Sequence, residues 1–403
     1  MDLYIARQPV FDKHLNVFGY ELLYRKNQEN RFLESDADEA SSNVIINAFN
    51  ILGIDKLTGG NRAFVNFTGN LLKQRVATLF PKDELVVEIL ETVQPTEETI
   101  RACLELKQQG YLLALDDFVN APIFKPFVDL ADIIKVEFTL SPEWERKSIV
   151  RQLGNGRIRF LAEKIETQEE FEKAKAWGYS FFQGFFFSRP VIQPMAEIPP
   201  MKVNQLRLLE LMNKKDIEFA ELSNIVTQDV SLSYKLLKLV NSSAFGLRAK
   251  IDSVRHALVM LGMAELRKWL SLIVMRGLAE SKPAELVRIS LIRARMLERL
   301  GLVLKMQGKT DDLFILGLFS CLDVLMDRPM AELLQGVSVS TEVKLALLQQ
   351  EGVFGFLISL VRYYEKGTWD EVTRYSDMLG IEHTEVCPTY LQAVEWCTGV
   401  LES

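Results

Sequence analysis

The stretch Gly110-Tyr111-Leu112-Leu113-Ala114-Leu115-Asp116-Asp117-Phe118 decides the fold class of the first half of the chain. Its apolar run is typical of a strand that is buried on both faces of a parallel sheet. A helical pattern over Thr96–Gln109 precedes the run and stops at Gly110, a residue type that commonly ends helices. The run is followed by two aspartates, Asp116 and Asp117, so negative charge is expected where the strand ends.

The same unit of helix, apolar run and polar end recurs on both sides of this stretch. The apolar runs are Leu3–Val10, Asn16–Arg25, Ala63–Thr68, Leu85–Leu90, Leu112–Phe118, Ile133–Phe138, Arg159–Ile165 and Tyr179–Phe187. Amphipathic patterns lie between several of them, as in Ser41–Leu52 and Thr167–Trp177. Alternating strands and helices indicate a parallel sheet, and seven such runs, with Leu3–Val10 as a candidate eighth, suit a closed barrel. We therefore predict an α/β fold, a TIM-like (β/α) barrel, over residues 1–200.

The character of the sequence changes after Val191–Val203, a stretch with three prolines that we expect to be a linker. Helical periodicity dominates beyond it. The expected helices are Leu206–Asn213, Glu218–Gln228, Ser231–Val240, Val254–Leu278, Glu285–Leu304, Asp312–Met326 and Thr341–Gln350. We predict an all-α domain over residues 201–403.

Composition limits the classes of partner. The 403 residues include 54 acidic and 47 basic side chains, for a net charge of −7. Nonspecific DNA binding would need clustered Lys and Arg, so no DNA partner is expected. The four cysteines form no CxxC pair, which indicates free thiols in a reducing compartment. No apolar run reaches the ~18 residues of a membrane span and no signal-peptide pattern occurs, so we expect a cytoplasmic protein without membrane contact.

Almost every expected strand carries one acid, amide or lysine near its C-terminal end. These residues are Glu21, Asn66, Glu88, Asp116, Asp117, Lys135, Glu163 and Gln183. In a (β/α) barrel such ends meet on one face, where the active site lies. A single acid there is ordinarily a helix cap or a salt-bridge partner, but five carboxylates on one face would repel one another without cations. Carboxylate and amide oxygens suit Mg²⁺, Mn²⁺ or Ca²⁺, and two such metals would activate water for phosphoryl chemistry.

The motifs around these residues resemble those of EAL domains, the cyclic-di-GMP phosphodiesterases. The matching motifs are Gly19-Tyr20-Glu21-Leu22-Leu23-Tyr24-Arg25, Val65-Asn66-Phe67, Glu88-Ile89-Leu90-Glu91, Ala114-Leu115-Asp116-Asp117-Phe118, Ile134-Lys135-Val136-Glu137, Leu161-Ala162-Glu163-Lys164-Ile165-Glu166 and Gln183-Gly184-Phe185-Phe186-Phe187-Ser188-Arg189-Pro190. They cover about residues 1–190 in the order of that family.

This resemblance implies a role for each residue. Glu21, Asn66, Glu88, Asp116, Asp117 and Glu163 would hold Mg²⁺ or Mn²⁺, with Glu21, Lys135 and Glu163 central to catalysis. Lys135 would act near the attacking water, and Arg25 and Gln183 would contact cyclic-di-GMP. Glu91 would brace the loop after Asp117. The implied reaction is hydrolysis of cyclic-di-GMP to linear pGpG, which would favour motility over biofilm formation.

The sequence departs from the family pattern at three places. Leu22 stands where the signature has Ala, and Glu137 stands where an Asp is usual. The loop after Asp117 reads Val119-Asn120-Ala121-Pro122, where active members have a glycine-rich run. In the family this loop organises the metals and the contact between two copies, so it bears on both catalysis and a homodimer. Two readings stay open: a phosphodiesterase, which the five carboxylates favour, or a catalytically degenerate cyclic-di-GMP receptor or scaffold.

The second half of the chain resembles the HDOD domain, a relative of HD phosphohydrolases. The matching stretches are Gln228–Leu232, Leu236–Phe245, Ile251–Leu258 and Leu261-Gly262. Ser320 and Cys321 stand where the His-Asp metal pair of an HD hydrolase would be, and neither His256 nor His383 belongs to such a pair. We therefore expect a helical regulatory domain that binds a protein partner and holds no metal.

Overall fold

The computed structural model describes residues 3–26, 53–118, 121–154, 156–188, 218–228, 253–278, 282–335 and 339–402, with positions 233, 236, 237, 240 and 251. The chain divides into two compact units. The first, called the barrel unit below, comprises Met1–Arg189 and the later segment Tyr364–Trp369. The second, the helical unit, comprises Pro190–Tyr363 and Asp370–Ser403.

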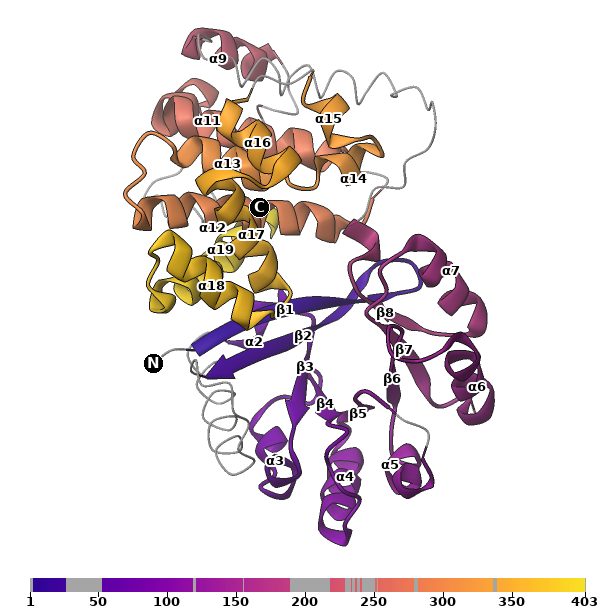
Figure 1. Ribbon diagram of the computed structural model, residues 1–403. Helices are drawn as coiled ribbons and strands as arrows, with labels where there is room; N and C mark the ends of the chain where they lie inside the picture. Colours follow the sequence, from indigo (N-terminus) through magenta and orange to yellow (C-terminus); the bar gives the residue numbers. More distant parts are fainter. Residues whose placement is uncertain are drawn as a thin grey trace. The chain divides into compact units, whose positions relative to one another are not determined.

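The barrel unit is a closed sheet of eight strands in chain order (Figure 1). The strands are β1 Leu3–Asp12, β2 Val17–Lys26, β3 Arg62–Phe67, β4 Leu85–Ile89, β5 Leu112–Leu115, β6 Ile133–Glu137, β7 Arg159–Glu163 and β8 Phe181–Gln183. Each overlaps one of the expected apolar runs, so the predicted barrel is confirmed. The strands β2 to β8 run parallel, whereas β1 is antiparallel to both β2 and β8.

The direction of β1 follows from the shortness of its connection to β2. Only four residues, 13–16, separate the two strands. A parallel crossover needs a dozen or more residues, so this connection can only form a hairpin. The Asp12 carboxylate closes the turn by accepting hydrogen bonds from the backbone N–H of His14 at 2.8 Å and of Asn16 at 2.9 Å.

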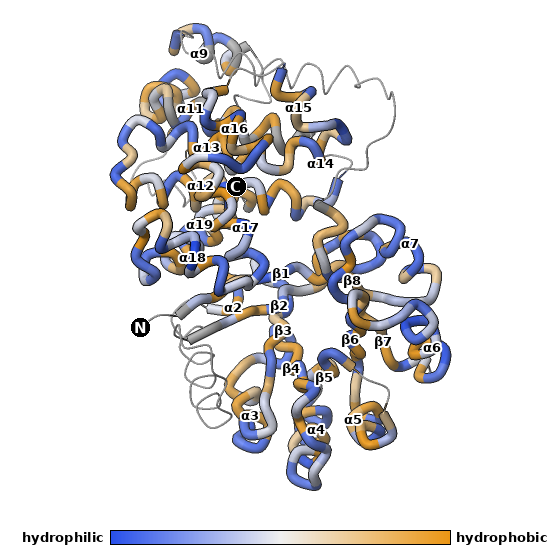
Figure 2. Tube along the Cα trace, in the orientation of Figure 1, coloured by the Kyte–Doolittle hydropathy of each residue, from blue (hydrophilic) through white to orange (hydrophobic). Residues whose placement is uncertain are grey.

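The short helices of the barrel unit lie between the strands, except for η3, which follows β8. They are α2 Ile54–Thr58, α3 Gly69–Lys73, η1 Val76–Leu79, α4 Glu97–Gln109, η2 Pro122–Phe124, α5 Lys125–Val128, α6 Glu143–Leu153, α7 Gln168–Trp177 and η3 Phe186–Ser188. Helix α4 ends at Gly110 and α7 at Gly178, both in the left-handed region, as predicted from the glycines. Hydrophilic residues are prominent on α4, α6 and α7 (Figure 2). The expected helix Ser41–Leu52 lies outside the described residues.

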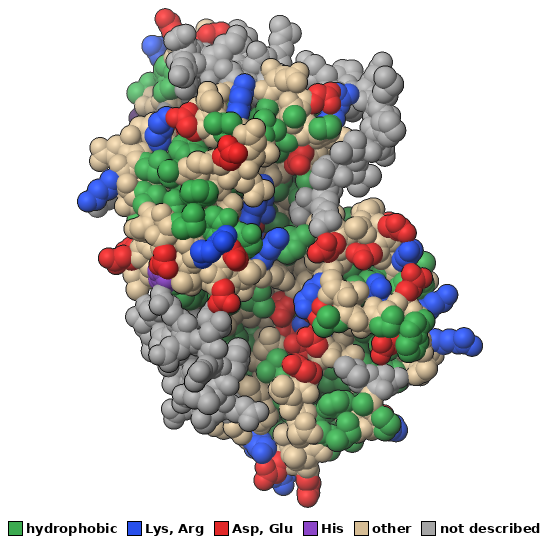
Figure 3. All heavy atoms as spheres, viewed as in Figure 1, with side chains coloured by type: hydrophobic (Ala, Val, Ile, Leu, Met, Phe, Trp, Pro, Cys, Tyr) green, Lys and Arg blue, Asp and Glu red, His purple; other side chains and the backbone are tan. Residues whose placement is uncertain are grey.

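One end of the barrel interior is apolar. Its buried cluster consists of Val10, Phe64, Val86, Ala114, Ile133, Leu161 and Phe181, one residue from each of seven strands. These side chains fill the lumen as in other eight-stranded barrels, and the polar residues lie further along the parallel strands. On the face that Figure 3 shows, acidic and basic side chains of the described residues are interspersed over the barrel unit.

The regular elements in the described part of the helical unit are all helices. Its elements are α9 Phe219–Gln228, α11 Val254–Leu278, α12 Ala284–Val303, α13 Thr310–Phe319, α14 Leu322–Met326, α15 Met330–Leu333, α16 Thr341–Gln349, α17 Gly352–Glu365, α18 Trp369–Leu379 and α19 His383–Glu402. The single helix expected over Asp312–Met326 is wrong, because the chain breaks at Ser320 and Cys321 into α13 and α14. The stretches Val191–Val203 and Leu206–Asn213 lie outside the described residues.

Among the described helices, no single one is both long and apolar enough to cross a membrane. The bent pair α16 and α17 passes that test by length and composition alone.

Candidate functional site

A buried lysine lies at the centre of the candidate site. Lys135, on β6, is only 1% exposed. Its Nζ lies 2.7 Å from Glu88 Oε1, 2.7 Å from Asp116 Oδ1, 3.0 Å from Glu163 Oε1 and 3.5 Å from Glu21 Oε1. Four strands or strand ends of the barrel therefore direct carboxylates at one ammonium group.

Strand register explains why these side chains meet. Glu88 lies opposite Asn66 across the β3–β4 ladder, so both project from neighbouring strands at the same level. Gln183, on β8, donates from Nε2 to Glu21 Oε2 at 2.5 Å and so links the last strand to β2. The structure thus brings Glu21 and Asn66 into the same interior as the residues around Lys135.

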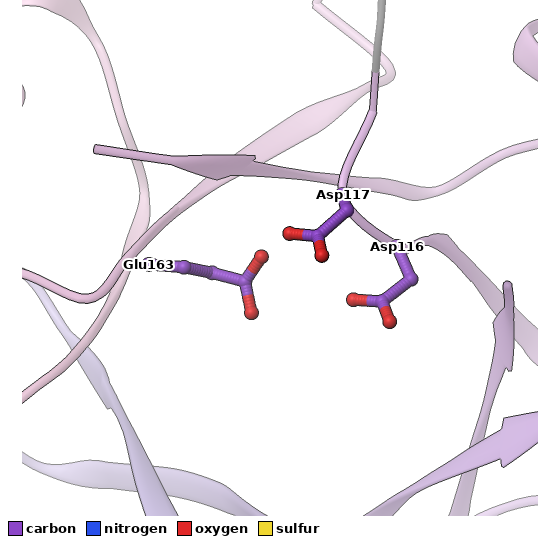
Figure 4. A group of neighbouring side chains, drawn as sticks. All are labelled: Asp116, Asp117 and Glu163. Carbon is purple, nitrogen blue, oxygen red and sulfur yellow. The ribbon is translucent and has the colours of Figure 1, made fainter. Parts of the chain in front are cut away.

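A second group of acids adjoins the lysine. Asp116, Asp117 and Glu163 offer oxygens that lie within 4.8 Å of one another, and Figure 4 shows the Glu163 side chain directed at the two aspartates. Asp117 has a positive φ of 38°, which turns the chain sharply just after β5. The Glu137 carboxylate beside this group accepts hydrogen bonds from Lys164 and Thr139.

Burial and neighbouring charges shift the pKa values of the ionisable side chains in the site. Burial raises the pKa of Glu163 to about 8, although the Lys135 ammonium opposes the shift. Burial likewise raises the pKa of Glu88 well above its usual range, against the same ammonium. Burial alone would lower the pKa of Lys135, but the surrounding carboxylates outweigh it and raise that pKa well above its usual value. Lys135 is therefore a permanent cation at neutral pH.

Several oxygens in this interior lack hydrogen-bond donors. Among the described residues, no donor reaches four buried acceptors: Asn66 Oδ1, Glu88 Oε2, Glu163 Oε2 and Gln183 Oε1. A buried acceptor without a partner costs about 1–3 kcal/mol, so such a cluster calls for another ligand. Carboxylate and amide oxygens are the donors that Mg²⁺ and Mn²⁺ prefer, and the residues present therefore fit these ions.

Not every predicted site residue can be placed in this interior. The side chain of Arg25 and the loop residues Val119 and Asn120 lie outside the described part of the chain. Glu91 is exposed and lines a small pocket together with Asp116, Asp117 and Phe118. The roles given to these residues and to the residues around Lys135 stay predictions.

Sequence reasoning missed Gln8, which lies at the edge of the same site. Gln8, on β1, faces Glu21 across the β1–β2 ladder, and its Oε1 accepts from Gln183 Nε2 at 3.1 Å. Its only sequence signal is an amide beside Arg7 within the run Leu3–Val10. Pairing it with Glu21 requires the antiparallel register, which the sequence pattern does not contain.

The helical unit has a guanidinium at the position expected for an HD metal pair. Arg293, on α12, donates to Ser320 Oγ at 3.1 Å and to Cys321 Sγ at 3.3 Å, and all three are buried. His256 is exposed, and His383 Nε2 lies 2.8 Å from Asp377. A buried fixed cation at this place would repel a metal ion, and the expectation that the helical domain holds no metal stays a prediction.

Comparisons with known proteins extend over the whole chain. Residues 198–353 match the family described as the HDOD domain, which confirms that expectation. The chain is 34% identical to YuxH of Bacillus subtilis over 411 aligned residues, covering 100% of both chains. It is 37% identical to the cyclic di-GMP phosphodiesterase CdgJ of Vibrio cholerae over 400 residues, covering 98% of this chain and 93% of CdgJ.

Two solved structures are similar to part of the chain. The cyclic-di-GMP complex of the PaMucR phosphodiesterase is 18% identical, covers 47% of this chain and 97% of its own, and has a TM-score of 0.40. The complex of BlrP1 from Klebsiella pneumoniae with manganese and cyclic-di-GMP is 24% identical, covers 47% of this chain and 56% of its own, and has a TM-score of 0.39.

Proposed function

This chain belongs to the family that includes YuxH and CdgJ, and we propose that it is a cyclic-di-GMP phosphodiesterase releasing linear pGpG. The observation that carries the proposal is the buried cluster of carboxylates around Lys135, which includes oxygens without donors. The name of CdgJ, at 37% identity over nearly the whole chain, supports the same substrate.

The proposed metals are Mg²⁺ or Mn²⁺. The residues that would hold them are Glu21, Asn66, Glu88, Asp116, Asp117 and Glu163. Such ions supply an activated water and a positive charge that stabilises the phosphoryl transition state. Since ligands must give up their protons, metal binding has to displace the proton that burial favours on Glu163.

Lys135 has two tasks in this proposal. Its ammonium screens the repulsion among the converging carboxylates, which keeps the ligands in place before a metal arrives. The same charge lies at the centre of the site, where it stabilises negative charge that develops on the phosphate. Arg25 and Gln183 are proposed to contact the dinucleotide, with the Arg25 guanidinium suited to a phosphate oxygen.

The proposal extends to the cell and to the rest of the chain. Lower cyclic-di-GMP would promote motility and oppose biofilm formation, and the protein would act in the cytoplasm. We propose a barrel domain over 1–200 and a regulatory helical domain over 201–403 that binds a protein partner. A homodimer through the loop after Asp117 belongs to the same proposal.

The experiment that tests the proposal is direct. Purified full-length protein is mixed with cyclic-di-GMP and Mn²⁺ or Mg²⁺, and the products are separated by chromatography. We expect pGpG from the wild type and from Glu172→Gln, whose side chain is exposed on α7, but none from Glu88→Gln. If the protein binds cyclic-di-GMP tightly but releases no pGpG with either metal, the phosphodiesterase interpretation is wrong. The receptor interpretation then takes its place.

A further inference from the structure

The barrel unit contains a segment from far along the chain. Tyr364–Trp369 belongs to this unit, although it joins α17 to α18, whose other residues lie in the helical unit. The Tyr364 hydroxyl is fully buried, donates to the Ile5 carbonyl at 2.9 Å and accepts from the Ile5 N–H at 3.3 Å. The segment is thus fixed to the backbone of β1 by a specific pair of hydrogen bonds.

Further contacts define the position of the same segment. The Tyr4 ring lies 5.5 Å from Trp369 and 6.4 Å from Tyr364, measured between ring centroids. Gly367 has a φ of +67°, and a Cβ built there would lie 2.7 Å from Leu23 Cδ1 on β2. The segment therefore fits closely against both strands of the hairpin, with no room for a larger residue at Gly367 unless the Leu23 side chain moves.

A chain of hydrogen bonds leads from this segment to the site. Gln8 Nε2 donates to the Lys366 carbonyl at 3.1 Å. Gln8 Oε1 accepts from Gln183 Nε2 at 3.1 Å, and the same Nε2 donates to Glu21 Oε2 at 2.5 Å. An amide NH₂ has two hydrogens, so Gln183 uses one for Gln8 and one for Glu21.

The Lys366 carbonyl sets the donor-to-acceptor direction of this series of hydrogen bonds. It can only accept, so it holds the NH₂ group of Gln8 toward itself and the Gln8 oxygen toward Gln183. The Glu21 carboxylate also only accepts, so Gln183 presents one hydrogen of its NH₂ to Gln8 and the other to Glu21. If the carbonyl moved away, Gln8 could rotate and oppose one NH₂ group with another, which would remove one of the two acceptors that fix Gln183 and loosen its support of Glu21.

We propose that Gln8 is a positioning residue that transmits the docking of Tyr364–Trp369 to Glu21 and thereby sets the metal affinity of the site. This inference rests on the proposed function, because it takes Glu21 as a metal ligand. It gives the segment Tyr364–Trp369, which joins α17 to α18, a hydrogen-bonded route to the barrel interior. A partner that strains α17 or α18 would weaken metal binding without touching the barrel itself.

The test compares three variants of the full-length chain. Gln8→Leu removes both hydrogen bonds of the amide, with Gln8→Met as a second variant should the first fail to fold. Tyr364→Phe leaves Gln8 intact but deletes the hydroxyl that fixes the segment. Tyr363→Phe is the matched control, because Tyr363 stacks on Tyr375 in the helical unit at 5.5 Å between centroids.

The primary readout is Mn²⁺ binding in the absence of nucleotide, which is measured from the electron paramagnetic resonance signal of free Mn²⁺. We expect the Mn²⁺ dissociation constant to rise about tenfold in Gln8→Leu, since a hydrogen bond that orients a charged ligand is lost. A smaller rise is expected in Tyr364→Phe and none in Tyr363→Phe. In turnover, the Mn²⁺ needed for half-maximal rate should rise while the KM for cyclic-di-GMP stays within about twofold.

The outcomes separate this inference from the proposed function. Equal Mn²⁺ affinities in the wild type, the Gln8 variants and Tyr364→Phe would overturn the inference, even if the wild type releases pGpG. A shift that appears equally in Tyr363→Phe would also overturn it, because the effect would then be general. If the wild type releases no pGpG but the expected affinity differences appear, the proposed reaction fails and the positioning role stands.

Discussion

Replacing Lys135 by methionine tests the electrostatics of the site most directly. The ammonium is buried and lies within 3.5 Å of four carboxylates, so the variant leaves these acids without their common cation. Removing one partner of a buried ion pair costs about 3–5 kcal/mol. We expect the free energy of unfolding at neutral pH to fall by about that amount in metal-free protein.

The loss of unfolding free energy in Lys135→Met should depend on whether a divalent metal is present. A divalent cation supplies the missing positive charge, so Mn²⁺ should restore more stability to Lys135→Met than it adds to the wild type. The assay is guanidinium unfolding with excess EDTA and with Mn²⁺. Lys107→Met is the control, because Lys107 pairs with Asp132 elsewhere in the barrel unit and its loss should not respond to metal.

Two results would refute this reasoning. One is an unfolding free energy of Lys135→Met equal to that of the wild type in EDTA, which would mean that the carboxylates do not need the cation. The other is a loss of stability that Mn²⁺ leaves unchanged, which would mean that the carboxylates do not bind the ion.

Three further predictions concern single groups. Glu88→Gln should abolish pGpG formation while the protein stays folded, since a metal site loses one buried ligand; chromatography and circular dichroism measure the two properties. In EDTA, the free energy of unfolding should fall as pH rises from about 5 to 8, because Glu163 has a folded pKa of about 8, above its unfolded pKa of about 4.3. Arg293→Met should destabilise the chain by about 1–3 kcal/mol in denaturant unfolding, because it removes the donor to Ser320 and Cys321.

A specific result would contradict each of these three predictions. Wild-type turnover in folded Glu88→Gln would show that this carboxylate is no ligand. The stability contributed by a raised Glu163 pKa is complete below the unfolded pKa and lost as pH rises through the folded one, so Glu163→Gln should flatten the profile. If the unfolding free energy of Glu163→Gln falls with pH as steeply as that of the wild type, other groups cause the pH dependence. Unchanged stability of Arg293→Met would mean that its two hydrogen bonds merely replace bonds to water.

The sequence predicted the strands well because each is a dense apolar run. In a barrel both faces of a strand are buried, so nearly every position is apolar and the run stands out without alternation. The convergence of Glu88, Asp116 and Glu163 was predictable for a related reason. Parallel strands present their C-terminal ends on one face, so a polar residue at the end of each run indicates a shared site.

The same reasoning could not predict the break between α13 and α14. Both sides of the break are apolar, and Ser320 and Cys321 are compatible with a helix, so periodicity continues through it. At the break both side chains accept hydrogen bonds from Arg293, which lies 27 residues before Ser320 in the chain. Local pattern contains no information about such a contact.

Gln8 shows why the remaining part of the site could not be predicted from the sequence. The apolar run Leu3–Val10 predicted a strand, but its direction depends on the hairpin, and its partners depend on register. A shift of one residue would turn Gln8 to the other face, away from Glu21 and Gln183. The antiparallel β1 therefore does more than close the barrel, because it is the strand that contacts both Glu21 and the Tyr364–Trp369 segment. Any change in the docking of this segment that reaches Glu21 through Gln8 must pass through this strand.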